Sequence, residues 1–317
     1  MAVVVFLESQ EGEIKKAGFE LASYGRSISD AMKCELIGVG FNIIDSKLLS
    51  NYGVDKLYNI DTRGDSYFDI ERYSSSIASV VKKEDAAIVI VSGSSDGRYL
   101  GPVLSVKVNA AYISNVVELP SEYEPLTVKR SCFTNKAFNE TRSSKRHNVL
   151  SLSSNSFGLK EKSTNIEVFS EDFAPSSTTL KVSNVDKASD KISIADADIV
   201  VSGGRGLKGP ENWHLIENLA EVLGAATACS KPVSDMGWRS HSEHVGQTGK
   251  PVASNLYIAI GVSGAIQHLA GINSSKVKVV INNDPEAPFF KAADYGIVGD
   301  AFEVVPKLTE KLKARKL

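Results

Sequence analysis

The second half of the chain contains a turn that combines several glycines with one arginine. Gly204, Gly206 and Gly209 satisfy the spacing G-x-G-x-x-G, in which glycine lets a backbone approach a nucleotide closely. A dinucleotide site of the usual kind also needs an acid for the ribose about 20 residues further on, and the predicted strand Ala225–Cys229 offers none. We therefore reject a standard NAD site. Arg205, within the turn, suits an anionic or aromatic ligand better than a core.

A second glycine-containing turn, Gly261–Gly264, leads directly into a predicted short helix, Ala265–Ala270. The free N–H groups and positive dipole end of a helix attract anions, and Ser263 adds a hydroxyl. An ordinary N-cap serine gives the same pattern, so both interpretations stay open. His268 lies one turn into this helix and can face a ligand above the turn, although an isolated histidine is more often a surface or core residue.

Hydrogen-bonding groups that suit a flat ring occur in the segment Val245–Lys250. There Gly246 and Gly249 bracket Gln247 and Thr248. An amide and a hydroxyl on a flexible backbone can bond along the edge of a heterocycle. A surface turn is the alternative interpretation.

Polar residues also follow several other predicted strands. Ser230 and Lys231 place a hydroxyl and a cation after the second strand of this half, and Asn282 and Asp300 close two later strands. Because ligands of parallel α/β sheets bind at the carboxyl ends of strands, all four residues are candidates for the same site. Asn282 and Asp300 suit adenosine hydroxyls or ring nitrogens, but Asn282 also begins a typical turn sequence.

Three other kinds of site are not expected. His241 and His244 have the spacing i, i+3, but no cysteine lies beside them, so we do not predict a metal site. Ser263, His268 and Asp300 do not form a hydrolase triad, because the sequence has no G-x-S-x-G elbow and the serine and histidine share one short helix. No Walker A lysine motif is present.

The elements that must position these residues form two α/β patterns. In the first half, short apolar runs alternate with helical patterns, which predicts a mostly parallel sheet covered by helices on both faces. After residue 119 we expect extra strands, which can run antiparallel, and a short edge strand. The predicted strands are Val3–Leu7, Cys34–Val39, Ala87–Val91, Ile113–Leu119, Leu126–Phe133, Val149–Leu152 and Ile166–Phe169. Two helices are predicted: one has Ile14, Ala17, Leu21 and Ile28 near one face, and the other spans about Ile70–Val81.

A polar, turn-rich stretch separates the two patterns, and residues 183–192 are typical of an interdomain linker. We therefore predict an N-terminal domain of residues 1–186 and a Rossmann-like C-terminal domain of residues 187–317. The second domain should again have one parallel sheet with right-handed crossovers. Its predicted strands are Asp198–Val201, Ala225–Cys229, Leu256–Ile260, Val277–Ile281 and Asp294–Val298, and its helices run from about Trp213 to a C-cap at Gly224, from Ala265 to Ala270 with Gly271 behind it, and from about Val305 to Lys313 with Pro306 in the first turn.

The overall composition is that of a globular protein with two cores. The 317 residues are 42% hydrophobic and 23% charged, and the net charge of −2 gives no reason to expect nucleic-acid binding. Three widely separated cysteines without a C-x-x-C pair point to a reducing compartment. No apolar run approaches the roughly 20 residues of a membrane span. We expect a soluble, cytoplasmic protein.

The turns and strand ends of the second half, in this order, resemble the C-terminal domain of electron transfer flavoprotein alpha subunits. The resemblance covers nearly all of residues 195–310, whereas the first half resembles the family mainly in its pattern and in Gly97–Pro102. The matching stretches are Val201–Gly206, Val245–Lys250, Leu256–Gly271, Ile281–Pro288 and Ala293–Val298.

The resemblance implies an FAD site in this domain. It places Arg205 against the isoalloxazine ring, Gln247 and Thr248 at the ring and ribityl chain, and His268 at the pyrimidine carbonyl. It gives the pyrophosphate to Ser230 and the turn Ser263–Ala265, and the adenosine to Asn282 and Asp300. The complete set of predicted FAD-binding residues is Arg205, Ser230, Lys231, Val245, Gly246, Gln247, Thr248, Ser263, Gly264, Ala265, Ile266, Gln267, His268, Asn282, Asp300 and Ala301.

One position departs from the family pattern, because Lys231 stands where relatives commonly carry arginine. Lysine is a point charge and cannot stack or bond in a planar fork, so FAD binding should persist while the stability of the one-electron-reduced flavin is in doubt. The cations Arg205 and Lys231, together with His268 if it is protonated, are the expected stabilisers of negative charge on the reduced ring. Replacing His268 by alanine should therefore lower the flavin potential more than it weakens FAD binding.

The resemblance also implies partners. The chain would be an electron carrier that pairs with a beta subunit through its N-terminal domain, accepts electrons from dehydrogenases such as those for acyl-CoA in fatty acid β-oxidation, and passes them to a membrane quinone oxidoreductase. An electron-bifurcating, NADH-oxidising complex is the alternative within the family. An NAD-binding metabolic enzyme and a non-catalytic nucleotide-binding module are alternatives of another class, and the missing ribose acid argues against the enzyme.

Overall fold

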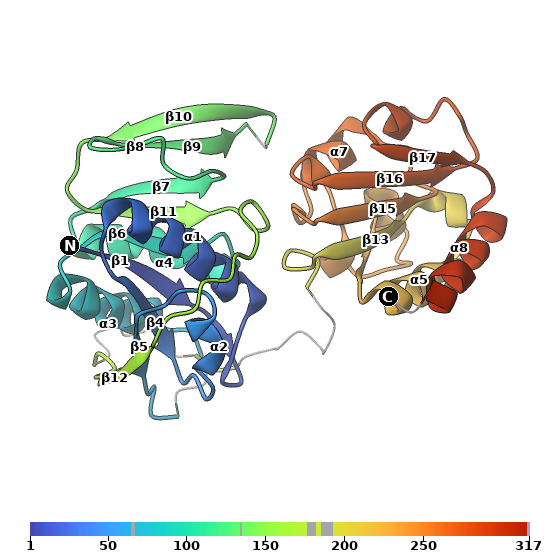
Figure 1. Ribbon diagram of the computed structural model, residues 1–317. Helices are drawn as coiled ribbons and strands as arrows, with labels where there is room; N and C mark the ends of the chain where they lie inside the picture. The colour runs from blue at the N-terminus through green and yellow to red at the C-terminus, as the bar shows by residue number, and fades with distance from the viewer. Residues whose placement is uncertain (65–66, 134, 176–181, 185–192, 316–317) are drawn as a thin grey trace. The chain divides into compact units, whose positions relative to one another are not determined.

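The computed structural model describes residues 1–64, 67–133, 135–175, 182–184 and 193–315 (Figure 1). The chain divides into two compact units, with the main boundary at residues 187 and 188. Most of the predicted linker therefore lies outside the described residues. Each unit has its own sheet and hydrophobic core. No helix in the described ranges is long and apolar enough to cross a membrane.

The N-terminal unit is built on a ten-stranded sheet with the order β10-β9-β7-β11-β6-β1-β4-β5-β12, and β8 pairs with β9. The pairs from β7 through β11, β6, β1, β4 and β5 to β12 are parallel, whereas β9 runs antiparallel to β7 and β8. A separate hairpin joins β2 (Ser9–Gln10) to β3 (Glu13–Ile14). The strands of the large sheet are β1 (Ala2–Leu7), β4 (Leu36–Phe41), β5 (Lys56–Ile60), β6 (Ala86–Ser92), β7 (Ala111–Val116), β8 (Glu122–Tyr123), β9 (Leu126–Cys132), β10 (Ala137–Ser143), β11 (Asn148–Leu152) and β12 (Glu167–Glu171).

Helices cover both faces of this sheet because its central strands are apolar on both sides. Along β1, Val3 and Val5 belong to the same core cluster as Leu21 of α1, while Val4 belongs to the second cluster with Ile77 of α3. Successive strand residues point to opposite faces, so a continuous apolar run fits a sheet between two helical layers. The helices are α1 (Lys16–Met32), α2 (Lys47–Ser50), α3 (Ile70–Lys83) and α4 (Ser95–Lys107).

The sequence prediction was wrong in three places in this unit. Helix α1 begins at Lys16, so Ile14 lies outside it on β3. Strand β11 is parallel to both of its neighbours and lies inside the sheet, so the antiparallel expectation fails for it, although it holds for β9. Several elements were not predicted at all: helices α2 and α4 and strands β2, β3, β5, β8 and β10.

The C-terminal unit contains a five-stranded sheet with the order β14-β13-β15-β16-β17, and every pair is parallel. Its two apolar layers are distinct. Helices α5 and α8 pack with Val201 and Ile258 on one face, and α7 packs with Val200 and Tyr257 on the other. The strands are β13 (Ile199–Gly203), β14 (Ala226–Cys229), β15 (Leu256–Ile260), β16 (Val277–Asn282) and β17 (Tyr295–Val298), and the helices are α5 (His214–Leu223), α6 (Lys231–Asp235), α7 (Ile266–Ile272) and α8 (Ala301–Arg315), with short 3-10 turns η1 (Arg205–Leu207), η2 (Pro210–Trp213), η3 (His241–Glu243) and η4 (Pro288–Lys291).

Two helix boundaries in this unit differ from the prediction. Helix α7 continues through Gly271, because this glycine packs against Gly246: a Cβ atom at Gly271 would lie 2.6 Å from the Cα of Gly246. Helix α8 begins at Ala301 and not near Val305, so Pro306 lies in its second turn. The alternating parallel α/β architecture itself is confirmed.

Candidate functional site at the carboxyl edge of the C-terminal sheet

The strand order of the C-terminal unit places its topological switch point between β13 and β15. Numbered within the unit, the order is the flavodoxin-like 2-1-3-4-5, and ligands of such sheets bind in the crevice where the connections diverge. The turns after β13 and β15 meet there: Gly204 N–H donates to the carbonyl of Ile260 at 2.9 Å, and Gly206 N–H donates to that of Gly261 at 3.1 Å. The two predicted glycine turns therefore form one structure.

Glycine is required here by close backbone contact. A Cβ atom at Gly204 would overlap the carbonyl oxygen of Gly261, and one at Gly261 would lie 2.9 Å from the Cα of Gly206. Gly261 also has a φ of +63°, which L side chains rarely adopt. The absence of side chains leaves bare backbone at the switch point, which is the surface that a nucleotide needs for close approach.

The turn after β15 presents unused backbone donors. The first helical bonds of α7 are donated by His268 and Leu269 to the carbonyl of Ala265, so the N–H groups of Ala265, Ile266 and Gln267 have no partner among the described residues. Ser263 next to them is exposed, and Gly264 turns with a φ of +85° against Phe289. These donors suit a phosphate group.

The 245–250 turn is attached to the same helix. Val245 N–H donates to the carbonyl of Cys229 at 3.0 Å, and Gln247 N–H donates to that of Gln267 at 2.7 Å. Together with the glycine contact between Gly246 and α7, these bonds hold Gln247 and Thr248 beside the α7 N-terminus, and both side chains are exposed.

His268 lies at the base of this region and is 6% exposed. Its Nε2 is 3.0 Å from the hydroxyl oxygen of Tyr257, and its Nδ1 has no hydrogen-bond partner of good geometry in the described part of the chain. Burial lowers the pKa of His268 to about 4, His244 acts in the same direction, and the backbone of Val245 opposes the shift in part. Burial therefore favours a neutral imidazole at neutral pH, and a protonated His268 beside the reduced ring stays a prediction.

Arg205 and the 230–231 pair lie at the neighbouring strand ends. Arg205 is exposed at the start of η1, and Lys231 is exposed as the first residue of α6. Ser230 is buried, and its N–H donates to the carbonyl of Gly203 at 3.1 Å, which joins the end of β14 to the end of β13. All three residues thus follow the two strands on the β14 side of the switch point.

The predicted adenosine residues have structural partners of their own. Asn282 donates its side-chain amide to the carbonyl of Val262 at 3.1 Å and accepts from Asp284 N–H at 3.0 Å. Asp300 accepts from Phe302 N–H at 2.9 Å and caps α8, and the side chain of Ala301 is buried in the core. These contacts fit the turn interpretation of Asn282. A role of Asn282 and Asp300 in binding adenosine stays a prediction, and so does contact of Ala301 with FAD.

Three polar residues behind the site were missed from the sequence. Tyr257, Ser202 and His244 are buried, and each lies within or directly beside an apolar run. Tyr257 contacts His268 directly, and His244 lowers its pKa. One signal in the sequence could have revealed Tyr257: a tyrosine within a buried strand needs a hydrogen-bond partner for its hydroxyl.

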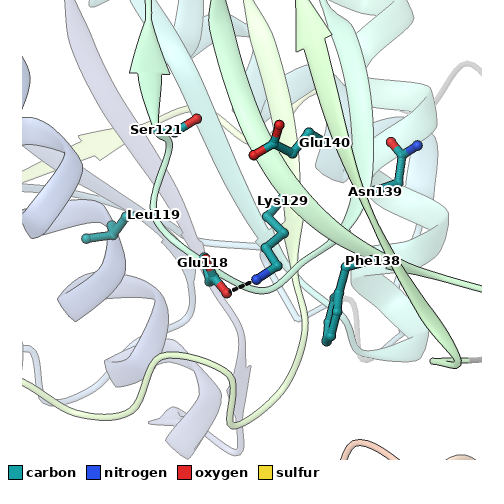
Figure 2. Close-up of a pocket in the computed structure, with 7 residues that line it drawn as sticks. All are labelled: Glu118, Leu119, Ser121, Lys129, Phe138, Asn139 and Glu140. Atoms are coloured by element: carbon teal, nitrogen blue, oxygen red, sulfur yellow. Dashed lines mark hydrogen bonds and ion pairs between the residues drawn. The ribbon is translucent and has the colours of Figure 1, made fainter.

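A surface pocket of about 290 Å³ lies in the other unit, between β9, β10 and the segment after β7. Glu118 and Lys129, which line this pocket, form an ion pair of 2.6 Å (Figure 2). The chemistry-bearing turns are instead an open edge of the C-terminal sheet, because Arg205, Gln247 and Thr248 are exposed. An open edge suits an elongated ligand that lies across several strand ends.

The residues present fit FAD. The side-chain-free backbone at Gly204, Gly206 and Gly261 allows close approach. The N–H groups at the N-terminus of α7 that have no partner among the described residues can hold phosphate oxygens. The buried Nδ1 of His268 makes no hydrogen bond of good geometry in the described residues and offers a hydrogen-bonding group to a ring with polar edges.

Comparisons with known proteins agree with this geometry. Residues 193–273 match the family model described as the electron transfer flavoprotein FAD-binding domain, and residues 3–174 match the electron transfer flavoprotein domain. The electron transfer flavoprotein subunit alpha of Bacillus subtilis is 37% identical over 98% of this chain and 97% of that protein. The corresponding subunit of Thermoanaerobacterium thermosaccharolyticum is 31% identical over 98% of both chains, and the protein FixB of Azotobacter vinelandii is 33% identical over 99% of this chain and 91% of that protein.

Among solved structures, Acinetobacter baumannii MurG superposes with a TM-score of 0.33 at 12% identity, over 99% of this chain and 90% of that one, which is too low to carry an argument. The family matches confirm the predicted resemblance and FAD as the cofactor of the family domain. The chain belongs to the electron transfer flavoprotein alpha subunit family.

Proposed function

We propose that this chain is the FAD-carrying alpha subunit of a heterodimeric electron transfer flavoprotein. The observation that carries the proposal is the convergence of two glycine turns, free N–H groups and a buried histidine at the switch point of the C-terminal sheet. FAD, when bound, supplies the electron-transfer chemistry, and the protein supplies binding, orientation and electrostatics.

Within this proposal the residues divide into two groups. Ser263 and the N–H groups of Ala265–Gln267 hold the pyrophosphate, with Ser230 beside them. Arg205, Gln247, Thr248 and His268 contact the ring system. Arg205 and Lys231 contribute positive charge, and neutral His268 contributes a hydrogen bond without charge.

The partners are part of the same proposal. The N-terminal domain, residues 1–186, contacts a beta subunit, and the domain of residues 187–317 carries FAD. Electrons come from dehydrogenases, such as the acyl-CoA dehydrogenases of fatty acid β-oxidation, and go to a quinone oxidoreductase at the membrane. The cysteine pattern supports a cytoplasmic location. Support for the beta subunit comes from family membership.

The test is to purify the full chain together with its beta subunit and to measure bound FAD and its absorbance spectrum during stepwise reduction. One FAD per heterodimer is the expected result, and two flavins together with NADH oxidation would favour the bifurcating alternative. A colourless complex that takes up no added FAD would refute the proposal.

A further inference from the structure

We infer that Tyr257 is a positioning residue that fixes His268 in the tautomer with the proton on Nδ1. The inference rests on the proposed function, because it concerns the group that His268 offers to the flavin. It assigns a role to a buried strand residue that does not itself reach the open edge of the site.

The geometry of the pair is well defined. The hydroxyl oxygen of Tyr257 lies 3.0 Å from Nε2 of His268, and the two rings make an edge contact with centroids 6.1 Å apart. Tyr257, the second residue of β15, is fully buried, and His268 is buried on α7, so neither side chain can exchange this partner for water. Phe289 packs on the other side of the imidazole, with centroids 6.1 Å apart.

The direction of the hydrogen bond follows from the surrounding groups. Burial raises the pKa of Tyr257 far above its usual value, so the phenol keeps its proton and can donate it. Ser202 lowers that pKa, which is the effect of a hydroxyl directed at the phenol oxygen, although its Oγ makes no hydrogen bond of good geometry in the described residues. A hydrogen bond from the imidazole to the backbone of Val245 favours a proton on His268, and Nε2 is already next to the Tyr257 hydroxyl. Tyr257 therefore donates to Nε2, and Nδ1 carries the imidazole proton.

This arrangement decides what the site offers to a ligand. A neutral imidazole has one donor and one acceptor nitrogen, and the acceptor is occupied by Tyr257. The remaining Nδ1–H makes no hydrogen bond of good geometry in the described residues, so an acceptor atom such as a ring carbonyl has to compete only with the backbone of Val245 for it. Without Tyr257 the two tautomers would compete, and the group facing the ligand would alternate between donor and acceptor.

The experiment reads the tautomer directly in the full chain without FAD. Long-range ¹H–¹⁵N correlation NMR separates the two tautomers of each of the five histidines, and the variant H268Q assigns the His268 signal by its loss. Wild type should show the Nδ1–H form, and Tyr257→Phe should show a mixture. In a separate titration, Tyr257→Phe should raise the FAD dissociation constant by roughly five- to tenfold.

Tyr24→Phe is the matched control, because Tyr24 is also fully buried and donates a hydrogen bond, to the carbonyl of Glu118 at 2.9 Å, in the other unit. It should change neither the tautomer nor FAD binding. An Nε2–H signal in wild type, or an unchanged tautomer in Tyr257→Phe, overturns the inference, and if Tyr257→Phe does not fold, the wild-type tautomer decides alone. Failure of the wild-type chain to take up FAD when assembled with its beta subunit would defeat the proposed function and leave the tautomer result standing.

Discussion

The depressed pKa of His268 predicts that the C-terminal unit loses stability as the pH falls. In the unfolded chain the imidazole binds a proton below its ordinary pKa of about 6.5, whereas in the folded unit it stays neutral down to about 4. The unfolded state therefore binds more protons in this window, and the free energy of unfolding decreases with falling pH. Between about pH 7.5 and about pH 5 the loss attributable to His268 is about 2 kcal/mol, because each unit of pKa difference contributes about 1.36 kcal/mol.

Urea unfolding followed by tryptophan fluorescence measures this loss in the correct unit. The chain has two tryptophans, and both Trp213 and Trp238 lie in the C-terminal unit, so their emission reports that unit in the full chain. The control is His268→Gln, which removes the titration and should flatten the pH dependence by the same amount. His244, whose pKa is also lowered by burial, leaves a residual slope in both proteins. Equal slopes for wild type and His268→Gln would refute the argument.

The remaining predictions concern the backbone and the strand ends. Gly261 and Gly224 have nearly equal φ values of +63° and +60°. Only at Gly261, however, would an added Cβ atom meet backbone atoms of the facing turn. Gly224→Ala should lower the free energy of unfolding by about 1–2 kcal/mol through backbone strain. Gly261→Ala should lower it further and should also abolish FAD binding, measured by fluorescence titration. Equal FAD affinity in the two variants would contradict the close-contact argument. Asp300→Ala should cost about 1 kcal/mol in urea unfolding through the lost helix cap. If FAD affinity also falls, adenosine binding is supported, and unchanged affinity assigns Asp300 to the cap alone. Lys231→Arg should leave the FAD dissociation constant within about threefold, because an exposed cation is screened by solvent, and a change above about tenfold would argue against this.

Much of the fold could be read from local pattern. Strand β15 was predicted with its correct ends, and the end of α5 at Leu223 was predicted from Gly224, which adopts the left-handed conformation as expected. These elements are decided by residues adjacent in sequence. The direction of β11 was not predictable in this way, because its partners β6 and β7 are set by distant contacts.

Helix α4 shows that helix propensity gives the wrong prediction where tertiary packing determines the local structure. Gly97, Gly101 and Pro102 are helix breakers by propensity, and they concealed a 13-residue helix. In the structure the two glycines are needed for contact: a Cβ atom at Gly97 would overlap the carbonyl of Ser92, and one at Gly101 would lie 3.0 Å from the Cζ of Tyr112. The residues that weaken the helix locally are those that let it approach the sheet.

In the candidate site, too, local sequence signals predicted some residues, whereas residues that depend on distant packing were not predicted. The glycine turns at Gly204 and Gly261 could be recognised because bare backbone at a strand end is itself a sequence signal. The buried residues behind these turns could not be recognised, because Tyr257 in a buried strand looks like any other core residue until the structure places His268 against it. The contact between Tyr257 and His268 nevertheless changes the charge that the site offers. Read from the sequence alone, His268 was a possible cation, whereas burial beside Tyr257 makes it a neutral donor, and the positive charge at this sheet edge then falls to Arg205 and Lys231.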